Sequence, residues 1–411
     1  MKHRNITHRI LNALADTPVV ILNGARQTGK STLVKWIARE HYPAEYVTLD
    51  DLNFLDAALN DPHGFINRLP KPVVIDEIQK APDLFTAIKM EVDSNRQPGT
   101  FLLTGSADIM LLPRLSDSLT GRMEIITLWP FSLGEIHGNR ENFIDRLFDK
   151  KSLNCSTLPS LNAQDFYRHL ITGGYPEMLN RKDPDRQKAW FRSYVTTILQ
   201  RDIRELSNIE GLTAMPRLLS LLATRIGNGL NIAELSRTAA IPQSTLKRYL
   251  ALFETTFLLR LLPAWSHNIG KRLVRSPKVF LNDSGLVSYL LDADEKTLSS
   301  KPELTGHLIE NFVVMECCKQ ITWNASNVTP FYFRTHTGRE VDLILEDTSG
   351  SVVALEIKSR ATVTSRDFKA LKFLSNELGE AFFRGIVLYT GNKVIPFGNS
   401  MWAIPVACVW S

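Results

Sequence analysis

The sequence predicts three folded parts in one chain: a parallel α/β core, a helical middle region and a second α/β domain. Three observations lead to this prediction. Short apolar runs alternate with helical patterns near the N-terminus, which is typical of a parallel sheet covered by helices. Short helical patterns separated by turn residues follow, and strand patterns return near residue 300. We expect a core at 1–135, a helical lid or linker at 136–205, a third part at 206–299 and a last part at 300–411.

Composition limits the classes of function. The 411 residues are 44% hydrophobic and 22% charged, as in ordinary globular proteins. A net charge of +5 permits a nucleic-acid partner without requiring one. The four cysteines include no C-x-x-C pair, which argues against zinc fingers and a disulfide framework. Since we find neither a signal peptide nor an apolar run that could span a bilayer, we expect a cytoplasmic protein without a membrane partner.

The first strand pattern, residues 18–22, leads into a glycine-rich loop and then a helical pattern, residues 32–40. The loop matches G-x-x-x-x-G-K-[ST], and it consists of Gly24, Ala25, Arg26, Gln27, Thr28, Gly29, Lys30 and Ser31. Glycines let backbone N–H groups surround phosphate, and a lysine reaches the β- and γ-phosphates. A serine hydroxyl at the last position suits Mg²⁺. The loop, together with Thr32, therefore predicts a site for ATP and Mg²⁺.

Carboxylates end a later strand of the predicted core. The apolar run 72–75 is followed by Asp76 and Glu77, and the strand 100–106 ends in Thr104 and Ser106. We expect Asp76 to hold Mg²⁺ and Glu77 to orient the attacking water. Ser106 is our candidate for sensing the γ-phosphate, with a simple strand-end turn as the alternative. Helical pattern 85–94 separates these two strands, and 46–49 is the remaining predicted strand.

These motifs resemble the AAA+ superfamily, specifically predicted ATPases of bacteria and archaea. The resemblance rests on Gly24 to Ser31, Asp76-Glu-Ile-Gln79, Leu103 to Ser106, and Gly173 to Glu177, a segment whose physical role the sequence leaves unexplained. It implies a P-loop AAA+ core and a homo-oligomer, most simply a hexamer. Arg122 is our candidate for an arginine that completes a neighbouring subunit's site, ahead of Arg114. A surface ion pair is the alternative for each.

The middle region has the pattern of a winged helix. A helix starts near Asn231, a turn follows at residues 240–242, and the next helix leaves Lys247 and Arg248 on its exposed face. Segments 257–265 and 278–281 then predict a hairpin with a basic tip at Lys271, Arg272 and Arg275. These five basic residues predict contact with DNA phosphates. Winged helices also dock proteins, so this alternative stays open.

The last part predicts a second chemical site. Helix 303–320 is followed by strands 330–333, 340–345 and 352–357, helix 365–378 and strand 385–389. Glu356 and Lys358 share one face of a strand because they are two residues apart, and Asp342 interrupts an apolar strand. Two carboxylates and a lysine are what metal-assisted phosphodiester hydrolysis requires. Mg²⁺ or Mn²⁺ would be held by Asp342, Glu356 and Glu310, the last on the helix.

This arrangement resembles the PD-(D/E)xK nuclease fold, which is the restriction-endonuclease-like fold. Asp342, Glu356 and Lys358 occupy its motif positions, and Glu310 is similar to the helix acid of its Holliday-junction resolvase branch. The pair Glu340-Val-Asp342 departs from the usual Pro-Asp. The alternative is a buried salt-bridge cluster in an inactive nuclease fold.

Taken together, the motifs predict an ATP-hydrolysing protein that binds and processes branched or end-containing DNA, with metal-dependent DNA cleavage at the C-terminal site. The alternative is an ATP-switched DNA-binding or protein-docking regulator with an inert nuclease fold. A protein-remodelling ATPase is the third hypothesis.

Overall fold

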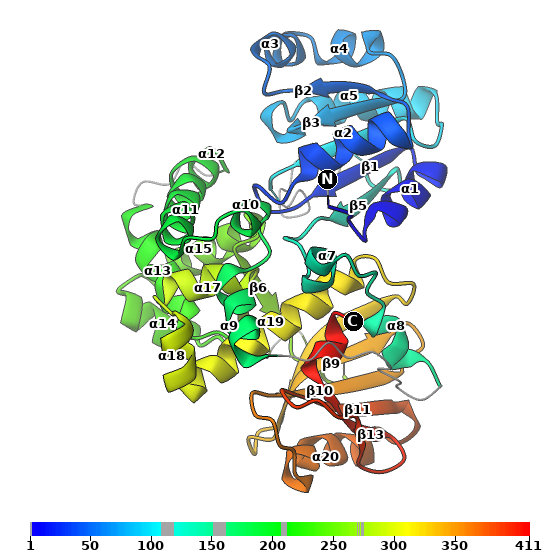
Figure 1. Ribbon diagram of the computed structural model, residues 1–411. Coiled ribbons are helices and arrows are strands. Elements are labelled where there is room, and N and C mark those ends of the chain that lie inside the picture. Colours follow the sequence, from blue (N-terminus) through cyan, green and yellow to red (C-terminus); the bar gives the residue numbers. More distant parts are fainter. Residues whose placement is uncertain are drawn as a thin grey trace. The chain divides into compact units, whose positions relative to one another are not determined.

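The computed structural model describes residues 2–107, 119–150, 162–206, 212–268, 270, 272 and 275–411. The chain divides into two compact units (Figure 1). The first unit contains residues 3–130 with 252–258, and the second contains 131–251 and 259–411 together with Lys2. Three of the four expected parts, from residue 136 onward, thus fall mostly in one compact unit.

The first unit is built on a five-stranded parallel sheet in the order β2-β3-β4-β1-β5. Its strands are β1 (Val19–Asn23), β2 (Glu45–Thr48), β3 (Val73–Asp76), β4 (Phe101–Gly105) and β5 (Met123–Thr127). The helices are α1 (Thr7–Asp16), α2 (Lys30–Glu40), α3 (Leu52–Asn60), α4 (Pro62–Arg68) and α5 (Leu84–Ser94). The predicted parallel α/β core is confirmed.

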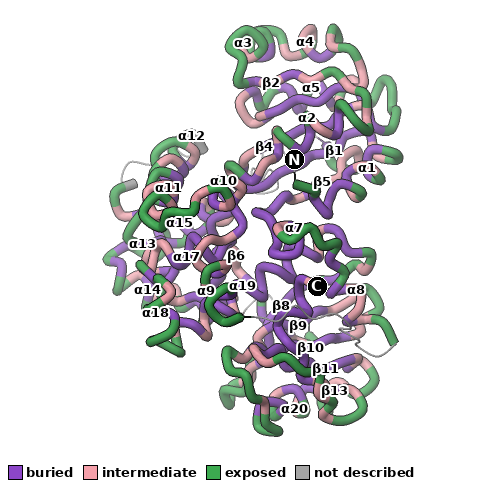
Figure 2. Tube along the Cα trace, in the orientation of Figure 1, coloured by how far each residue is buried: buried purple, intermediate pink, exposed green. Residues whose placement is uncertain are grey.

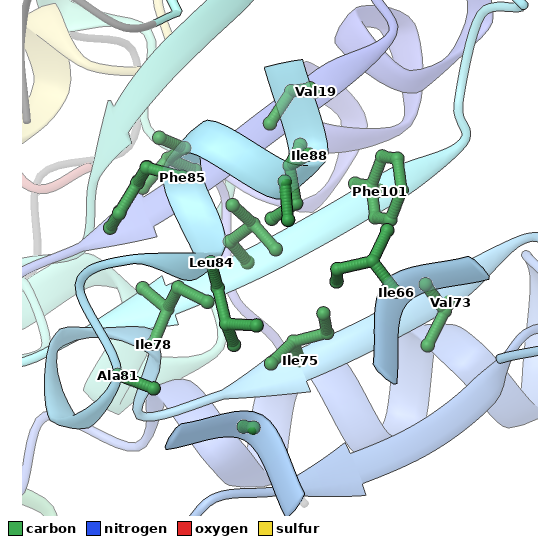
Figure 3. Close-up of a cluster of buried hydrophobic side chains, with 14 of the residues drawn as sticks. Val19, Ile66, Val73, Ile75, Ile78, Ala81, Leu84, Phe85, Ile88 and Phe101 are labelled. Atoms are coloured by element: carbon green, nitrogen blue, oxygen red, sulfur yellow. The ribbon is translucent and has the colours of Figure 1, made fainter. Parts of the chain in front are cut away.

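Burial explains why three of the four predicted strands form continuous apolar runs in the sequence. Every residue of β1, β3 and β4 is buried, so they form continuous apolar runs with helices on both faces. Their side chains meet those of α5 in one hydrophobic cluster (Figure 3), in which Ile75, Ile88 and Phe101 are fully buried. We did not predict β5. It is mostly half-buried, and its Glu124 pairs with Arg9.

The second unit begins with helices α7 (Leu133–His137), α8 (Phe143–Phe148), α9 (Ala163–Thr172), α10 (Pro176–Leu179) and α11 (Pro184–Thr197). A π-helical turn, Ile198–Asp202, joins α11 to α12 (Ile203–Leu206). Then come α13 (Met215–Ala223), α14 (Ile232–Ala239), α15 (Gln243–Thr255) and the antiparallel strands β6 (Leu259–Leu262) and β7 (Lys278–Leu281). Helices α17 (Ser284–Leu290) and α18 (Glu295–Ser300) complete this region.

The turn between α14 and α15 has the expected form. Asn231 accepts a hydrogen bond from the Glu234 N–H at the start of α14, and Ala240 adopts φ 56° at its end. The hairpin β6–β7 is also present. Its long connection, however, pairs with a strand of the C-terminal sheet, because Ala264 bridges Tyr332. Of the expected basic tip, Arg272 contacts Glu346 of that sheet and Arg275 contacts the Arg334 carbonyl.

The C-terminal sheet is mixed, in the order β12-β13-β11-β10-β9-β8. Its strands are β8 (Val328–Arg334), β9 (Glu340–Asp347), β10 (Val352–Lys358), β11 (Phe382–Tyr389), β12 (Ile395–Pro396) and β13 (Met401–Pro405). Strands β8, β9 and β10 form an antiparallel meander, while β10, β11 and β13 are parallel. Helices α19 (Pro302–Ile321) and α20 (Lys369–Leu378) accompany them. Figure 2 shows that most residues of the central strands β10 and β11 are buried.

The cysteines depart in part from expectation. Cys317 and Cys318, in α19, are free and buried. Cys408 is disulfide-bonded, so the chain is not free of disulfides.

Among the described residues, no helix combines the length and apolarity needed to cross a membrane.

Candidate functional site

The glycine-rich loop lies between β1 and α2, at the carboxyl end of the parallel strands. Gly24 has φ 146°, and a Cβ there would lie 2.2 Å from the Leu128 carbonyl oxygen. Gly29 has φ 93° and caps α2. Since side chains are strained or excluded at both positions, the loop keeps its N–H groups accessible to an anion.

Lys30 is the first residue of α2, and it folds back over the loop. Its Nζ donates to the carbonyl oxygens of Gly24 and Ala25, both at 2.9 Å, and the residue is only 5% exposed. Carbonyl oxygens are weak partners for an ammonium compared with phosphate oxygens. The lysine is thus held at the loop in a position from which phosphate can take its hydrogen bonds.

The remaining loop residues differ in exposure. Thr28 is buried and donates to the Ala25 carbonyl at 2.9 Å, which closes the turn. Arg26 is half-buried, whereas Gln27 (φ 61°) and Thr32 are exposed. These three side chains can reach solvent or a bound ligand.

The carboxylate of Asp76, at the end of β3, accepts hydrogen bonds from three hydroxyl groups. Ser31 Oγ donates to Asp76 Oδ1 at 3.1 Å, Tyr46 donates to Oδ2 at 2.6 Å, and Thr104 donates to Oδ1. Burial, followed by the bond to Asp76, raises the pKa of Tyr46, so it stays a protonated donor. A serine hydroxyl and a carboxylate in contact are the oxygen ligands that Mg²⁺ prefers. These residues therefore fit the predicted Mg²⁺ shell.

Glu77 adopts the left-handed conformation with φ 62°. Its N–H donates to Thr104 Oγ1 at 3.1 Å, and its carboxylate accepts from Gln79 Nε2. The same Gln79 amide donates to Ser106 Oγ at 3.0 Å. Glu77 is thus oriented by Thr104 through the backbone and by Ser106 through Gln79. We did not predict a role for Tyr46 or Gln79. For Gln79 the signal was its place in the Asp-Glu-Ile-Gln motif.

Arg122 precedes β5 at the amino end of the parallel strands, the edge opposite the phosphate loop. Its guanidinium contacts Asp93 and the Thr120 carbonyl, and that contact lowers the pKa of Asp93. Arg122 is therefore in a surface ion pair. Arg114 lies outside the described residues.

In the second unit, the structure brings together the four predicted C-terminal residues and adds two more, Lys278 and Glu340. Lys278 of β7 is 1% exposed, and its Nζ contacts Glu310 at 2.8 Å, Glu340 at 2.5 Å and Asp342 at 3.4 Å. Burial lowers the pKa of Lys278, but these carboxylates outweigh it and raise the pKa overall. Burial raises the pKa of Glu310 to about 8, with Asp342 adding to the shift. We did not predict Lys278 or Glu340 as members of this cluster.

The other half of the cluster lies on β10. Lys358 Nζ donates to Glu356 Oε1 at 2.6 Å, while Glu356 Oε2 is buried and has no hydrogen-bond partner among the residues that the structure describes. Burial, followed by Asp342, raises the pKa of Glu356 to about 8. Asp342 Oδ2 accepts from the Ile357 N–H at 2.8 Å.

The three predicted ligands of the C-terminal metal, Glu310, Asp342 and Glu356, already contact lysine side chains. In the described part of the chain, no group of three or more His, Cys, Asp or Glu is arranged to hold a metal ion. The carboxylates Glu310 and Asp342 face an ammonium, and one oxygen of Glu356 faces another. As arranged, these residues do not fit the metal that the nuclease resemblance implies.

The predicted DNA-binding residues fall into two groups. Lys247 and Arg248 are exposed on α15. Arg272 is instead bonded to both oxygens of Glu346, at 2.5 and 2.8 Å. Arg275 is half-buried and donates to the Arg334 carbonyl at 3.1 Å, and Lys271 lies outside the described residues.

The segment Gly173 to Glu177 has a structural role. The Gly174 N–H donates to buried Asp283 at 2.7 Å, and its carbonyl accepts from the Phe131 N–H at 2.8 Å. A Cβ on Gly174 would lie 2.1 Å from the Phe131 carbonyl oxygen. Tyr175 is fully buried and accepts from Asn282 at 2.9 Å. Gly174 therefore allows a backbone contact that is too close for any side chain.

Three family models match successive segments of the chain. The model of the AAA domain matches residues 16–137, and the domains of unknown function DUF8612 and DUF4143 match residues 163–297 and 305–409. The "Uncharacterized protein Rv2008c" of Mycobacterium tuberculosis is 30% identical over 406 residues, 98% of this chain and 84% of that protein. The "Uncharacterized protein Mb2031c" of Mycobacterium bovis matches with the same values.

This chain belongs to the family of these two mycobacterial proteins. Its first unit has the AAA-type P-loop ATPase fold, as the family model and the parallel sheet agree. Among solved structures, AMPPCP-bound DnaA from Aquifex aeolicus is 14% identical, with 61% of this chain and 86% of that chain covered and a TM-score of 0.29. The RuvB branch migration motor of Thermotoga maritima is 18% identical, with 63% and 89% covered and a TM-score of 0.29. Scores this low support no inference about this family.

Proposed function

We propose that the protein hydrolyses ATP at the loop between β1 and α2. The observation that carries this proposal is the contact of 3.1 Å between Ser31 and Asp76, directly beside Lys30. Lys30 would transfer its hydrogen bonds from the loop carbonyls to the phosphates. Ser31 and Asp76 would hold Mg²⁺, which neutralises charge on the phosphate oxygens when bound. Glu77 would orient the attacking water, while hydrogen bonds from Gln79 and to Thr104 hold Glu77 in place.

Two variants test the proposal. Lys30→Ala should weaken nucleotide binding, and Glu77→Gln should bind ATP but hydrolyse it very slowly. Glu45→Gln is the matched control, because Glu45 is exposed at the opposite end of the sheet. Hydrolysis is measured by phosphate release, and affinity is measured with a fluorescent ATP analogue. Undiminished ATP binding by Lys30→Ala would refute the assignment.

We also infer that the protein acts as a homo-oligomer, most simply a hexameric ring. The AAA-type fold of the first unit supports this inference. Arg122 is bonded to Asp93 within its own chain and would have to leave that ion pair to act on a neighbour. A strand of five residues spans about 15 Å. Arg122 lies at the amino end of the strands, so its side chain cannot reach the phosphate loop of its own chain at their carboxyl end. If Arg122 promotes hydrolysis, it does so in a neighbouring subunit. Arg122→Ala subunits mixed with Glu77→Gln subunits should regain activity, whereas parental activity of assembled Arg122→Ala alone excludes this role.

DNA is the partner we propose, and α15 is the proposed contact. The capped α14, the turn at Ala240 and the exposed Lys247 and Arg248 support this assignment. The hairpin tip supports it less, because Arg272 is bonded to Glu346. The test is ATP hydrolysis with and without branched and end-containing DNA. A rate that no DNA changes would favour the protein-remodelling hypothesis instead.

For the C-terminal domain, a specific observation favours the second candidate function. The order of α19, β8, β9, β10, α20 and β11 supports the predicted nuclease-like fold. Nevertheless, Lys278 contacts the acids that would hold Mg²⁺ or Mn²⁺. We therefore favour an ATP-switched DNA-binding or protein-docking regulator over DNA cleavage. To decide between the regulator and the nuclease, the wild-type protein is incubated with linear, nicked and branched DNA and Mg²⁺ or Mn²⁺. Metal-dependent cleavage that is lost in Asp342→Asn would support the nuclease hypothesis and contradict the inert fold.

A further inference from the structure

The contacts of Lys278 carry an inference that is independent of ATP hydrolysis. Its backbone position is fixed from both sides. In the preceding loop, Gly227 N–H donates to the Val279 carbonyl and Val279 N–H to the Asn228 carbonyl, at 2.9 and 3.0 Å. On α19, Asn311 both accepts from the Leu281 N–H and donates to the Leu281 carbonyl, at 2.9 and 3.0 Å. Strand β7 is therefore firmly attached to the helix that carries Glu310.

The side chain of Lys278 is equally constrained. An ammonium group has three N–H donors, and three carboxylates from two elements meet it: Glu310 from α19, and Glu340 and Asp342 from β9. Tyr332 places its ring 5.6 Å from the same nitrogen. On the far side of Glu310, Gly227 leaves no room for a side chain, since a Cβ would lie 2.7 Å from Oε2. All three donors have acceptors within the protein.

A divalent cation would need the same oxygens. Mg²⁺ binds carboxylate oxygens at about 2.0–2.1 Å and tolerates little distortion of its octahedral shell. An ammonium among those carboxylates both repels a second cation and uses its ligands. Removing the lysine charge, in contrast, leaves three acids together, an arrangement that a divalent cation can compensate.

We propose that the Lys278 ammonium is the resident cation of the Glu310, Glu340 and Asp342 cluster. It stands in place of a metal, and its contacts attach the β6–β7 hairpin to α19 and β9. A consequence follows for the variant Lys278→Met, which keeps the length of the side chain without its charge. This variant should acquire a divalent-cation site that the wild type does not have.

The experiment uses the full chain without nucleotide and Mn²⁺ alone as the probe, with free Mn²⁺ measured by electron paramagnetic resonance. Lys278→Met should bind about one more Mn²⁺ per chain than wild type, at least about tenfold more tightly than any site there. Mn²⁺ should raise its melting temperature more than that of wild type. The double variant Lys278→Met/Asp342→Asn should lose the gain. A single variant that folds and gains no Mn²⁺ site would refute the proposal.

The wild-type protein provides a test that needs no variant at Lys278 to fold. Lys278 should resist acetylation of the native protein, with exposed Lys247 as the reactive control, and Mn²⁺ should leave this protection unchanged. Wild type and Asp342→Asn should also bind Mn²⁺ equally. If Asp342→Asn loses an ion that wild type binds, or if Mn²⁺ exposes Lys278 to acetylation, a metal is the native occupant and the proposal fails. Neither the Mn²⁺ binding nor the acetylation measurement depends on ATP hydrolysis. Failure of this proposal can therefore be told apart from failure of the ATPase proposal.

Discussion

Thr104 connects the two acids of the nucleotide site, so removing its hydroxyl tests the site directly. Thr104 is fully buried, donates to Asp76 and accepts from the Glu77 N–H. Thr104→Val keeps the shape of the side chain and deletes both hydrogen bonds. A bond to a charged group contributes about 1.5–3 kcal/mol, and a buried N–H without an acceptor costs about 1–3 kcal/mol. Because Asp76 keeps Ser31 and Tyr46 as donors, we expect a loss of about 2–4 kcal/mol in the free energy of unfolding.

The effect on hydrolysis should be larger than the effect on nucleotide binding. Lys30 and the loop N–H groups do not depend on Thr104, whereas the orientation of Glu77 does. We expect single-turnover hydrolysis to slow about 10- to 100-fold, which corresponds to about 1.4–2.7 kcal/mol in activation free energy. ATP affinity should change little.

Thr100→Val is the matched control, because Thr100 precedes the same strand at its other end and donates to the Gln97 carbonyl. Urea unfolding and rapid-quench hydrolysis measure the two effects. Parental hydrolysis by folded Thr104→Val would refute the reasoning. A loss of ATP affinity equal to the loss of rate would show that Thr104 acts on binding instead.

The remaining predictions concern the second unit. Gly174→Ala should lower the free energy of unfolding by about 2–4 kcal/mol, because its Cβ would clash with the Phe131 carbonyl. Gly229→Ala is the control and should cost about 0.5 kcal/mol or less, since a Cβ there has no neighbour within 4 Å among the described residues. Exchanging Lys247 and Arg248 for Gln should weaken binding to all DNA sequences and reduce the salt dependence of the affinity by about one unit per lost phosphate contact. An unchanged salt slope would exclude α15 as the contact.

The nucleotide site could be predicted from the sequence because its parts are local. A phosphate loop is defined by consecutive residues, and the apolar run of β3 fixes where Asp76 and Glu77 emerge. Strand order then brings Thr104 beside them, as parallel strands align their carboxyl ends. Gly174 was different. Its partners Asp283 and Phe131 are distant in sequence, so the motif was visible while its role was not.

The basic tip shows what a charge pattern in the sequence leaves out. Lys271, Arg272 and Arg275 form a cluster in the sequence, and clustered basic residues favour a nucleic-acid surface. Arg272, however, pairs with Glu346, which is 74 positions away, and stacks near Trp265 and Phe331 at 5.3 and 4.8 Å. A long-range partner of this kind leaves no local trace, because neither a strand period nor a turn signal encodes it.

The same limit explains why the C-terminal acids suggested a metal. Asp76 and Asp342 read alike in the sequence, since each is an acid on an apolar strand. In the structure, Asp76 accepts from the neutral hydroxyls of Ser31, Tyr46 and Thr104. Asp342 instead faces the ammonium of Lys278, 64 positions away. The first carboxylate is thus surrounded by neutral donors, as the proposed Mg²⁺ site requires, whereas the second faces a cation from within the chain.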